Sequence, residues 1–205
     1  MFRLIKRKFQ RIAGVLSGVK QTFQDKIFLL SFCRKFNKAN IDIYPSKLIE
    51  KGAVIKIVGG GSIKIGKQFR MRAPAQILSY KGQIRIGDNC SLNQFSVVFG
   101  LGGLTIGNGV RIGTHTVIIP SNHNFDRTDI PIFKQGETMN GIVIEDDVWI
   151  GANCTICDGV VIGEGTVIGA GSVVTRSISP FSVAFGSPAR VRRSRSEKQC
   201  SNFLH

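Results

Sequence analysis

Histidine, tryptophan, tyrosine and acidic residues are all scarce in this chain of 205 residues. It has three histidines, one tryptophan and two tyrosines, and 13 Asp and Glu stand against 28 Lys and Arg. No apolar run approaches the roughly 20 residues that a membrane-spanning helix needs. No uninterrupted apolar segment precedes a small-residue cleavage site, so a signal peptide is not expected. These absences predict a cytoplasmic protein with few candidates for acid–base chemistry.

The cysteines give no sign of a disulfide framework or a metal site. There are five, an odd number, and without a secretion signal they indicate a reducing compartment. Cys154 and Cys157 form a CxxC pair, but no second ligand pair accompanies them. We interpret both as packing residues and expect no metal.

The positive charge is concentrated at the two ends. Residues 1–40 hold ten Lys and Arg against one acid, and residues 190–205 hold five against one. Within residues 1–40 the apolar residues recur every three or four positions, which is typical of an amphipathic helix. Such a helix could contact anionic lipid at the inner membrane face or cover the base of the next domain, and both readings stay open. Nucleic acid is not expected, because basic and aromatic residues do not alternate on a sheet.

The strongest pattern is an aliphatic residue at every sixth position. Neither a helix nor an alternating strand has this period, whereas a three-sided parallel β-helix does. This six-residue spacing, here called the stride, also occurs upstream. It is interrupted after Ile118 and resumes at Ile144, so residues 120–141 are expected to leave the coil as a loop. The in-phase residues after this interruption are Ile144, Ile150, Ile156, Ile162, Ile168 and Val174.

Two of the three histidines lie near the broken stride. His115 belongs to a regular repeat, where an outward-facing surface histidine without a task is the default interpretation. His123 lies in SNHNFD (121–126), where the chain leaves the coil. A histidine on a loop beside a rigid scaffold suits a general base, since its pKa is ordinarily near neutral pH.

The C-terminal half resembles the hexapeptide-repeat acetyltransferases, specifically their maltose/galactoside and polysaccharide O-acetyltransferase branch. The motifs that carry this resemblance are IEDDVWIGANCTICDGVVIGEGTVIGAGSVVTRSI (144–178) and SVAFGSPARVRR (182–193). With weaker repeats before them, the likeness covers about residues 60–193. It implies a left-handed parallel β-helix that forms a homotrimer, binds acetyl-CoA between neighbouring prisms and sends its loop toward the next subunit. We therefore divide the chain into a basic helical segment (1–50), the β-helix (51–189, loop 120–141) and a basic tail (190–205).

The resemblance also assigns roles to residues. His123 would be the general base that takes a proton from a sugar hydroxyl, with Asp126 a weak candidate to orient it, and Asn93 would contact the acceptor. No acyl-enzyme is implied, because both substrates bind together. The positions that match the acetyl-CoA groove are Trp149, Ala152, Ala170, Thr175, Arg176, Arg190 and Arg193.

The family's usual N-terminal acceptor-shaping segment has no counterpart here, which leaves the acceptor open. We expect transfer to a sugar of surface polysaccharide (capsule, exopolysaccharide or lipopolysaccharide), made at the inner membrane face. Transfer to an antibiotic or serine, and a non-catalytic trimeric scaffold that docks on membranes, remain alternatives. A carbonic anhydrase on the same fold would need three metal-binding histidines, which the spacing of His115, His123 and His205 does not supply.

Overall fold

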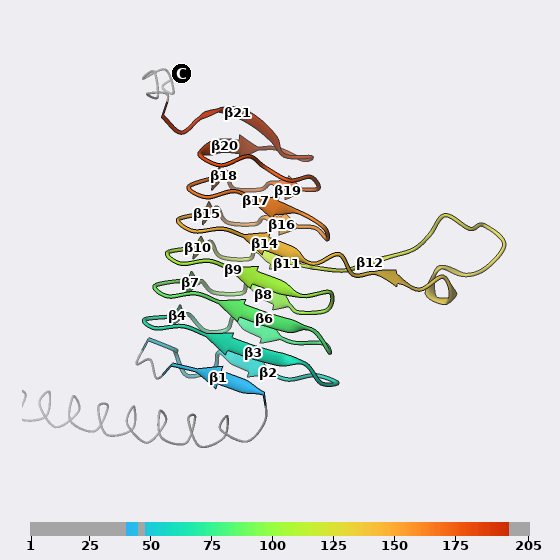
Figure 1. Cartoon of the computed structure of the whole chain (residues 1–205), viewed down its shortest axis with the longest axis horizontal. Coiled ribbons are helices and arrows are strands. Elements are labelled where there is room, and N and C mark those ends of the chain that lie inside the picture. The colour runs from blue at the N-terminus through green and yellow to red at the C-terminus, as the bar shows by residue number, and fades with distance from the viewer. Residues whose placement is uncertain (1–39, 45–47, 197–205) are drawn as a thin grey trace, which may run out of the picture.

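The computed structural model describes residues 40–44 and 48–196, which form a three-sided solenoid of short strands (Figure 1). The expected amphipathic helix falls on residues that lie outside this description. Within the described residues, no helix has the length and apolar character needed to cross a membrane.

Each side of the solenoid is one sheet, here called faces A, B and C. Face A consists of β1 (Ile41–Ile43), β3 (Ser62–Ile65), β6 (Gln83–Ile86), β9 (Leu104–Ile106), β14 (Ile142–Ile144) and β17 (Val161–Ile162). Face B consists of β4 (Arg70–Met71), β7 (Ser91–Leu92), β10 (Arg111–Ile112), β15 (Trp149–Ile150), β18 (Val167–Ile168), β20 (Ser182–Phe185) and β21 (Arg190–Ser194). Face C consists of β2 (Val54–Lys56), β5 (Gln76–Leu78), β8 (Val97–Phe99), β11 (Val117–Ile118), β16 (Thr155–Ile156) and β19 (Val173–Val174).

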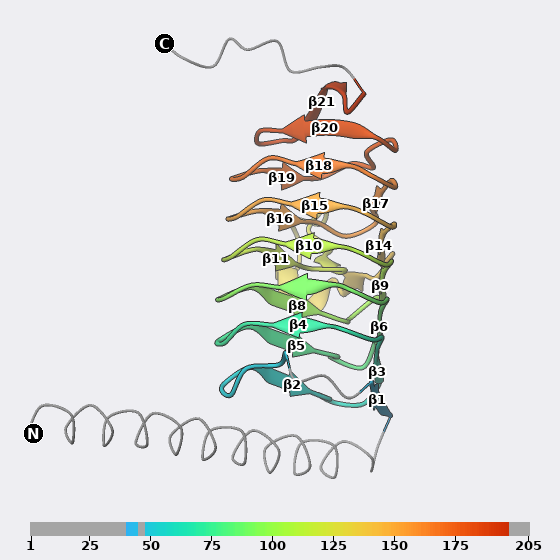
Figure 2. The ribbon, with the colours of Figure 1, turned by 90° about the vertical axis from the view of Figure 1, so that its left-hand side faces the viewer.

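The chain visits the faces in the order A, B, C, and we name each corner by the two faces that it joins. Neighbouring strands within a face pair in parallel, except β20 and β21, which pair antiparallel at the C-terminal end. Seen from that end, the chain runs clockwise while it rises toward the viewer, which is the left-handed sense (Figures 1 and 2). The all-β, left-handed parallel β-helix expected from the repeat and the resemblance is therefore confirmed.

The core is a set of aliphatic ladders along the axis of the prism. On face B, Leu92 aligns with Ile112, Ile112 with Ile150, and Ile150 with Ile168. All four side chains are at most 3% exposed. A buried Ile or Leu stabilises the fold by about 1.5–3 kcal/mol relative to an exposed one. Since one coil cannot bury its own apolar residues, stacking of coils produces the core.

The parallel pairing begins earlier than expected. In β1, Ile41 aligns with Ile63 and Ile43 with Ile65, so residues 41–43 are part of the solenoid and not of a helical segment. The triplet Ile41-Asp42-Ile43 has the same apolar–polar–apolar pattern as Ile63-Lys64-Ile65, but it lies 22 residues upstream, outside the regular stride. At the other end, β21 (Arg190–Ser194) continues face B, so these residues are a strand in place of the expected tail.

A ladder of hydrogen bonds links successive coils at the A/B corner. The backbone N–H of Asp88 donates to Asn108 Oδ1 over 2.8 Å, and the backbone N–H of Asn108 donates to Asp146 Oδ1 over 2.8 Å. Asn108 Nδ2 also donates to Asp146 Oδ2 over 3.1 Å. These donations from the Asn108 backbone and then its side chain hold the pKa of Asp146 below its ordinary value.

Replacing Asp146 by Ala should lower the free energy of unfolding at pH 7 by about 1 kcal/mol, because the carboxylate's hydrogen bonds are solvent-exposed and weaker than buried ones. A lowered folded-state pKa stabilises the fold above the unfolded pKa, and this stabilisation is lost as pH falls through the folded value. The difference in stability between the two proteins, measured by denaturant titration, should therefore be smaller at about pH 3 than at pH 7. Asp126→Ala, outside the ladder, is the control; an equal loss there, or a difference that does not shrink in acid, would contradict this account.

Candidate functional site

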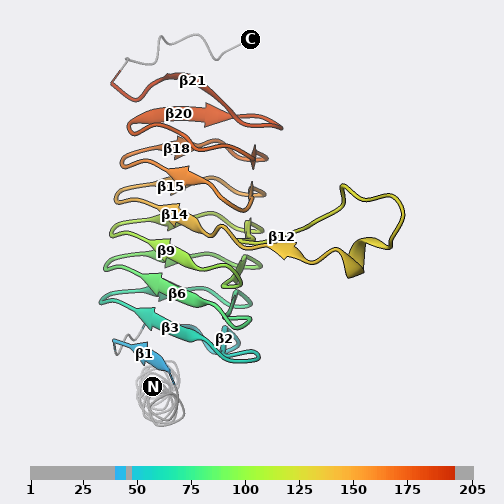
Figure 3. The same cartoon turned by 45° about the vertical axis from the view of Figure 1, so that its right-hand side comes forward.

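The interruption of the six-residue spacing corresponds to an arm, residues 120–141, that projects from the C/A corner at mid-height (Figures 1 and 3). It contains β12 (Asn122–His123), a short 3₁₀ helix (Ile132–Lys134) and β13 (Glu137–Thr138), with β12 and β13 paired antiparallel. At its root, Asp158 of the next coil accepts hydrogen bonds from the backbone N–H groups of Asn140 (3.2 Å) and Gly141 (2.9 Å). The arm is thus fixed to the prism by a carboxylate.

Hydrogen bonds within the arm hold its shape. The backbone N–H of Asn124 donates to the carbonyl of Gly136 over 3.0 Å, and Asn124 Nδ2 donates to the carbonyl of Gln135 over 3.1 Å. Gln135 Nε2 in turn donates to the carbonyl of Arg127 over 2.7 Å. A loop braced in this way can present a side chain in a defined place.

His123 lies on this arm and faces Glu137 on the opposite strand. The two are direct register partners, and His123 Nδ1 is 3.6 Å from Glu137 Oε1. The side chain of His123 is 62% exposed and that of Glu137 31% exposed. The carboxylate beside the imidazole is therefore Glu137, 14 positions along the chain, rather than Asp126. A pairing of two strands of two residues each leaves no periodic signal, so Glu137 could not be identified from the sequence.

Two of the expected acetyl-CoA positions meet at the B/C corner. Ala152 and Ala170 occupy equivalent turns of successive coils, and the backbone N–H of Gly171 donates to the carbonyl of Ala152 over 2.8 Å. A Cβ added to Gly151 would lie 2.6 Å from the backbone nitrogen of Ala170, so glycine is required for this close stacking. Ala152, Ala170 and Gly171 thus make a strip of small residues along this part of the corner, beside the exposed Asn153.

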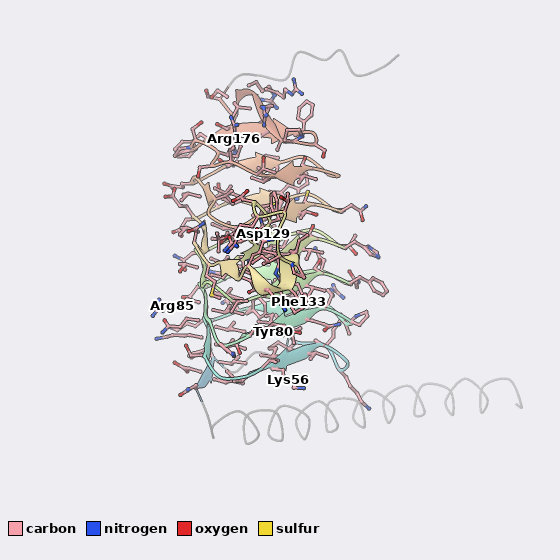
Figure 4. The ribbon with its side chains drawn as sticks, turned by 90° about the vertical axis from the view of Figure 1, so that its right-hand side faces the viewer. Lys56, Tyr80, Arg85, Asp129, Phe133 and Arg176 are labelled. Atoms are coloured by element: carbon pink, nitrogen blue, oxygen red, sulfur yellow. The ribbon has the colours of Figure 1, made fainter. Side chains whose placement is uncertain are left out.

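The other expected donor positions lie elsewhere on the same chain. Trp149 projects from face B and is 57% exposed. Thr175 and Arg176 follow β19 at the C/A corner, on the side from which the arm projects (Figure 4). Arg190 and Arg193 lie on β21, where their guanidinium groups donate to the nearby backbone carbonyls of Ala189 (2.9 Å) and Ser194 (3.1 Å).

Asn93 lies at the B/C corner, two coils below Ala152. Its Nδ2 donates to the carbonyl of Ile112 over 3.0 Å, which links two coils. The arm with His123 leaves from the C/A corner instead. One prism therefore keeps the expected base and the expected acceptor contact at different corners, and the described residues of a single chain do not form one cleft around them.

A shallow hollow of about 530 Å³ lies beside the root of the arm on face A. It contains none of the site residues expected from the sequence. Five glycines contribute to its lining, with Gln83, Arg85 and Asn140 among the polar side chains. No group of three or more His, Cys, Asp or Glu within residues 40–44 and 48–196 is placed to hold a metal ion.

Comparisons with known proteins agree with the solenoid fold. Residues 141–176 match the family model of the bacterial transferase hexapeptide (six repeats). The chain is 32% identical over 139 residues to the putative lipopolysaccharide biosynthesis O-acetyl transferase WbbJ of Escherichia coli, covering 64% of this chain and 71% of that one. It is 28% identical over 164 residues to the probable acetyltransferase Rv3034c of Mycobacterium tuberculosis, covering 78% of this chain but only 55% of that relative. The crystal structure of the hexapeptide-repeat acetyltransferase VCA0836 of Vibrio cholerae with acetyl coenzyme A is similar at a TM-score of 0.58 and 34% identity, over 64% of this chain and 70% of that one.

Proposed function

This chain belongs to the hexapeptide-repeat acetyltransferases, and we propose that it transfers the acetyl group of acetyl-CoA to a sugar hydroxyl in surface polysaccharide biosynthesis. The observation that carries the proposal is the braced arm that presents His123 beside Glu137, on a prism whose B/C corner has a strip of small residues. The putative lipopolysaccharide biosynthesis O-acetyl transferase WbbJ, matched over 71% of its length, supports the choice of acceptor.

In the proposed reaction, His123 Nε2 accepts the proton of the acceptor hydroxyl while its oxygen attacks the thioester carbonyl. A new C–O bond forms, the C–S bond breaks, and the CoA thiolate leaves and takes a proton. Glu137, whose Oε1 is 3.6 Å from Nδ1, would orient the ring in the manner of a carboxylate–histidine pair. General-base assistance of this kind contributes about 10²–10⁴-fold to the rate.

The proposed site needs two copies of the chain, in a homotrimer. The outward residues of face C support self-association, because from β8 to β19 they include no charged side chain. They are Val97, Phe99, Val117, Ile119, Thr155, Cys157 and Val173, all partly exposed. Depletion of charge is typical of interface cores. Packing of this face against a neighbour would bring the arm of one copy toward the B/C corner of another.

The donor would lie along that corner. Ala152 and Ala170 would border the pantetheine arm, with Trp149 beside it and Thr175 and Arg176 contributed at the same inter-subunit groove. Arg190 and Arg193 would lie near the nucleotide phosphates, which guanidinium groups bind strongly. Asn93, lower on the corner, would contact the acceptor.

We place the enzyme in the cytoplasm, with peripheral contact to the inner membrane face through residues 1–40 as a prediction outside the described residues. A direct test supplies radiolabelled acetyl-CoA with polysaccharide fragments, lipid-linked glycans, serine and chloramphenicol. Label on a glycan hydroxyl is the expected result. Label only on serine or chloramphenicol would contradict the proposed acceptor, and acetyl-CoA binding without transfer to any of them would contradict the proposed reaction.

A further inference from the structure

Two aromatic rings are stacked on the B/C corner below the strip of small residues. The rings of Phe95 and His115 are 4.8 Å apart between centroids and 13° from parallel. They occupy the third position of equivalent four-residue turns in successive coils, the turns after β7 and β10. Both residues are exposed, Phe95 by 54%. The regular stride gives no reason for a ring at either place.

The backbone conformation at this position is energetically unfavourable for side chains of this size. Phe95 has φ 62° and His115 has φ 57°, in the left-handed region. The equivalent residues one and two coils above His115 are Asn153 (φ 56°) and Gly171 (φ 72°), the residue types that tolerate this conformation best. Phe95 is therefore an exposed apolar side chain where Asn or Gly would be less strained, and its stacking on a second ring, more than the strain itself, makes the pair a candidate for binding.

A hydrogen bond fixes the histidine ring of the pair. Thr114 Oγ1 donates to the carbonyl of Gln94 over 2.6 Å and lies 3.1 Å from His115 Nδ1. The turn that contains His115 is therefore linked to the turn that contains Phe95 by the hydrogen bond from the Thr114 hydroxyl as well as by ring stacking. The two rings form a pre-organised surface.

The height of the two rings along the prism indicates which part of a bound donor would lie beside them. Going down from the C-terminal end, β21 with Arg190 is followed at the B/C corner by Ala170, Ala152, His115 and then Phe95. A donor held with its phosphates near β21 and its pantetheine along the two alanines would end at the level of His115. The arm with His123 leaves from the coil that contains His115, at the same height (Figure 1).

We infer that the stacked Phe95–His115 pair is the platform on which the acceptor's sugar ring lies, with the C–H-bearing face of a pyranose against the outer face of the stack, because each ring covers the inner face of the other. This inference rests on the proposed function and specifies its acceptor: a cyclic sugar rather than serine. The face of one aromatic ring is an apolar surface of about the size of a pyranose face, and the second ring holds it in place, while the hydroxyl groups at the edge of the sugar stay available to the base. Asn93, on the same turn as Phe95, lies beside the platform.

The test measures sugar binding separately from transfer. The full chain, loaded with CoA, is titrated with the methyl pyranosides of galactose, glucose, mannose and N-acetylglucosamine by saturation-transfer NMR and calorimetry. At least one should bind, and Phe95→Ala and His115→Ala should each weaken that binding about five- to tenfold. His115→Phe keeps a ring in place and should bind within about twofold of the parent, which separates stacking from proton transfer.

Phe181→Ala is the matched control. Phe181 is also 52% exposed with φ 51°, but it lies at the A/B corner, and its replacement should leave sugar binding unchanged. Binding of none of the four glycosides, or equal losses in Phe95→Ala and Phe181→Ala, would overturn the platform. Acetyl transfer measured in parallel keeps the two proposals apart. Transfer to a glycoside that is unaffected by Phe95→Ala removes the platform alone, whereas Phe95-dependent binding without any transfer removes the proposed function alone.

Discussion

Replacing His123 by Ala should lower kcat for acetyl transfer by about 10²–10⁴-fold, the usual contribution of a general base. The side chain is 62% exposed on the arm and supports no part of the prism core, so the fold and the affinity for acetyl-CoA should be unchanged. The measurement is the initial rate of CoA release with saturating acceptor, together with the acetyl-CoA dissociation constant and the mass of the assembly. Full activity in a folded His123→Ala enzyme would remove the histidine from the reaction.

Glu137→Gln tests the carboxylate beside His123 and should have a smaller effect than His123→Ala. It keeps the shape of the side chain and removes the charge 3.6 Å from His123 Nδ1. A positioning role predicts a fall in kcat of about tenfold, smaller than for His123→Ala, with KM for both substrates little changed. Asp126→Asn, three residues from His123 but not its register partner, should have no comparable effect. A larger loss in Asp126→Asn than in Glu137→Gln would assign the orienting carboxylate to Asp126.

Replacing Ala170 by Trp should raise KM for acetyl-CoA by at least about 100-fold, because an indole would fill the strip that the small side chains leave open at the B/C corner. Ala170 is exposed and its turn has no other large side chain, so the prism should accept the substitution without unfolding. Isothermal titration with CoA and a thermal-unfolding curve separate lost binding from lost structure. Undiminished CoA affinity would show that the donor binds elsewhere.

Thr175→Trp is the matched variant at the C/A corner, which in the proposed trimer would border the donor from the neighbouring copy. If two corners of different copies enclose the donor, Thr175→Trp should weaken CoA binding as Ala170→Trp does. If the donor lies on one corner of one chain, only one of the two substitutions should have an effect.

The prism could be predicted from the sequence because its core is formed by residues that recur at a fixed spacing. Stacking requires the same residue type at the same phase in every coil, so the stride from Ile144 to Val174 specifies the inward positions, and the 26-residue gap before Ile144 specifies where the arm leaves. The start of the prism was missed for the same reason. Ile41 and Ile43 pair with Ile63 and Ile65, but a single triplet 22 residues upstream has no neighbours in phase.

The site could be predicted only in part. A histidine at the point where the stride fails is visible in the sequence, as His123 was. Its pairing with Glu137 depends on two strands of two residues each, which leave no pattern. From the sequence, His115 is expected to be a surface histidine on a face of the prism, with no function. The structure instead places it at a corner, stacked on Phe95, and this contact depends on alignment of coils that are 20 residues apart and on a backbone φ that the sequence does not reveal.

The most direct test of a site shared between copies mixes two inactive variants. His123→Ala chains keep an open B/C corner and lack the base, whereas Ala170→Trp chains keep the base and lack the open corner. The two proteins are unfolded together, refolded at equal concentrations and assayed against each refolded alone. A site built from two copies predicts that activity returns, to about one quarter of wild type for random assembly. No activity above the separate variants, in assemblies shown by native mass spectrometry to be mixed, would mean that each chain must supply both parts itself and would contradict the shared site.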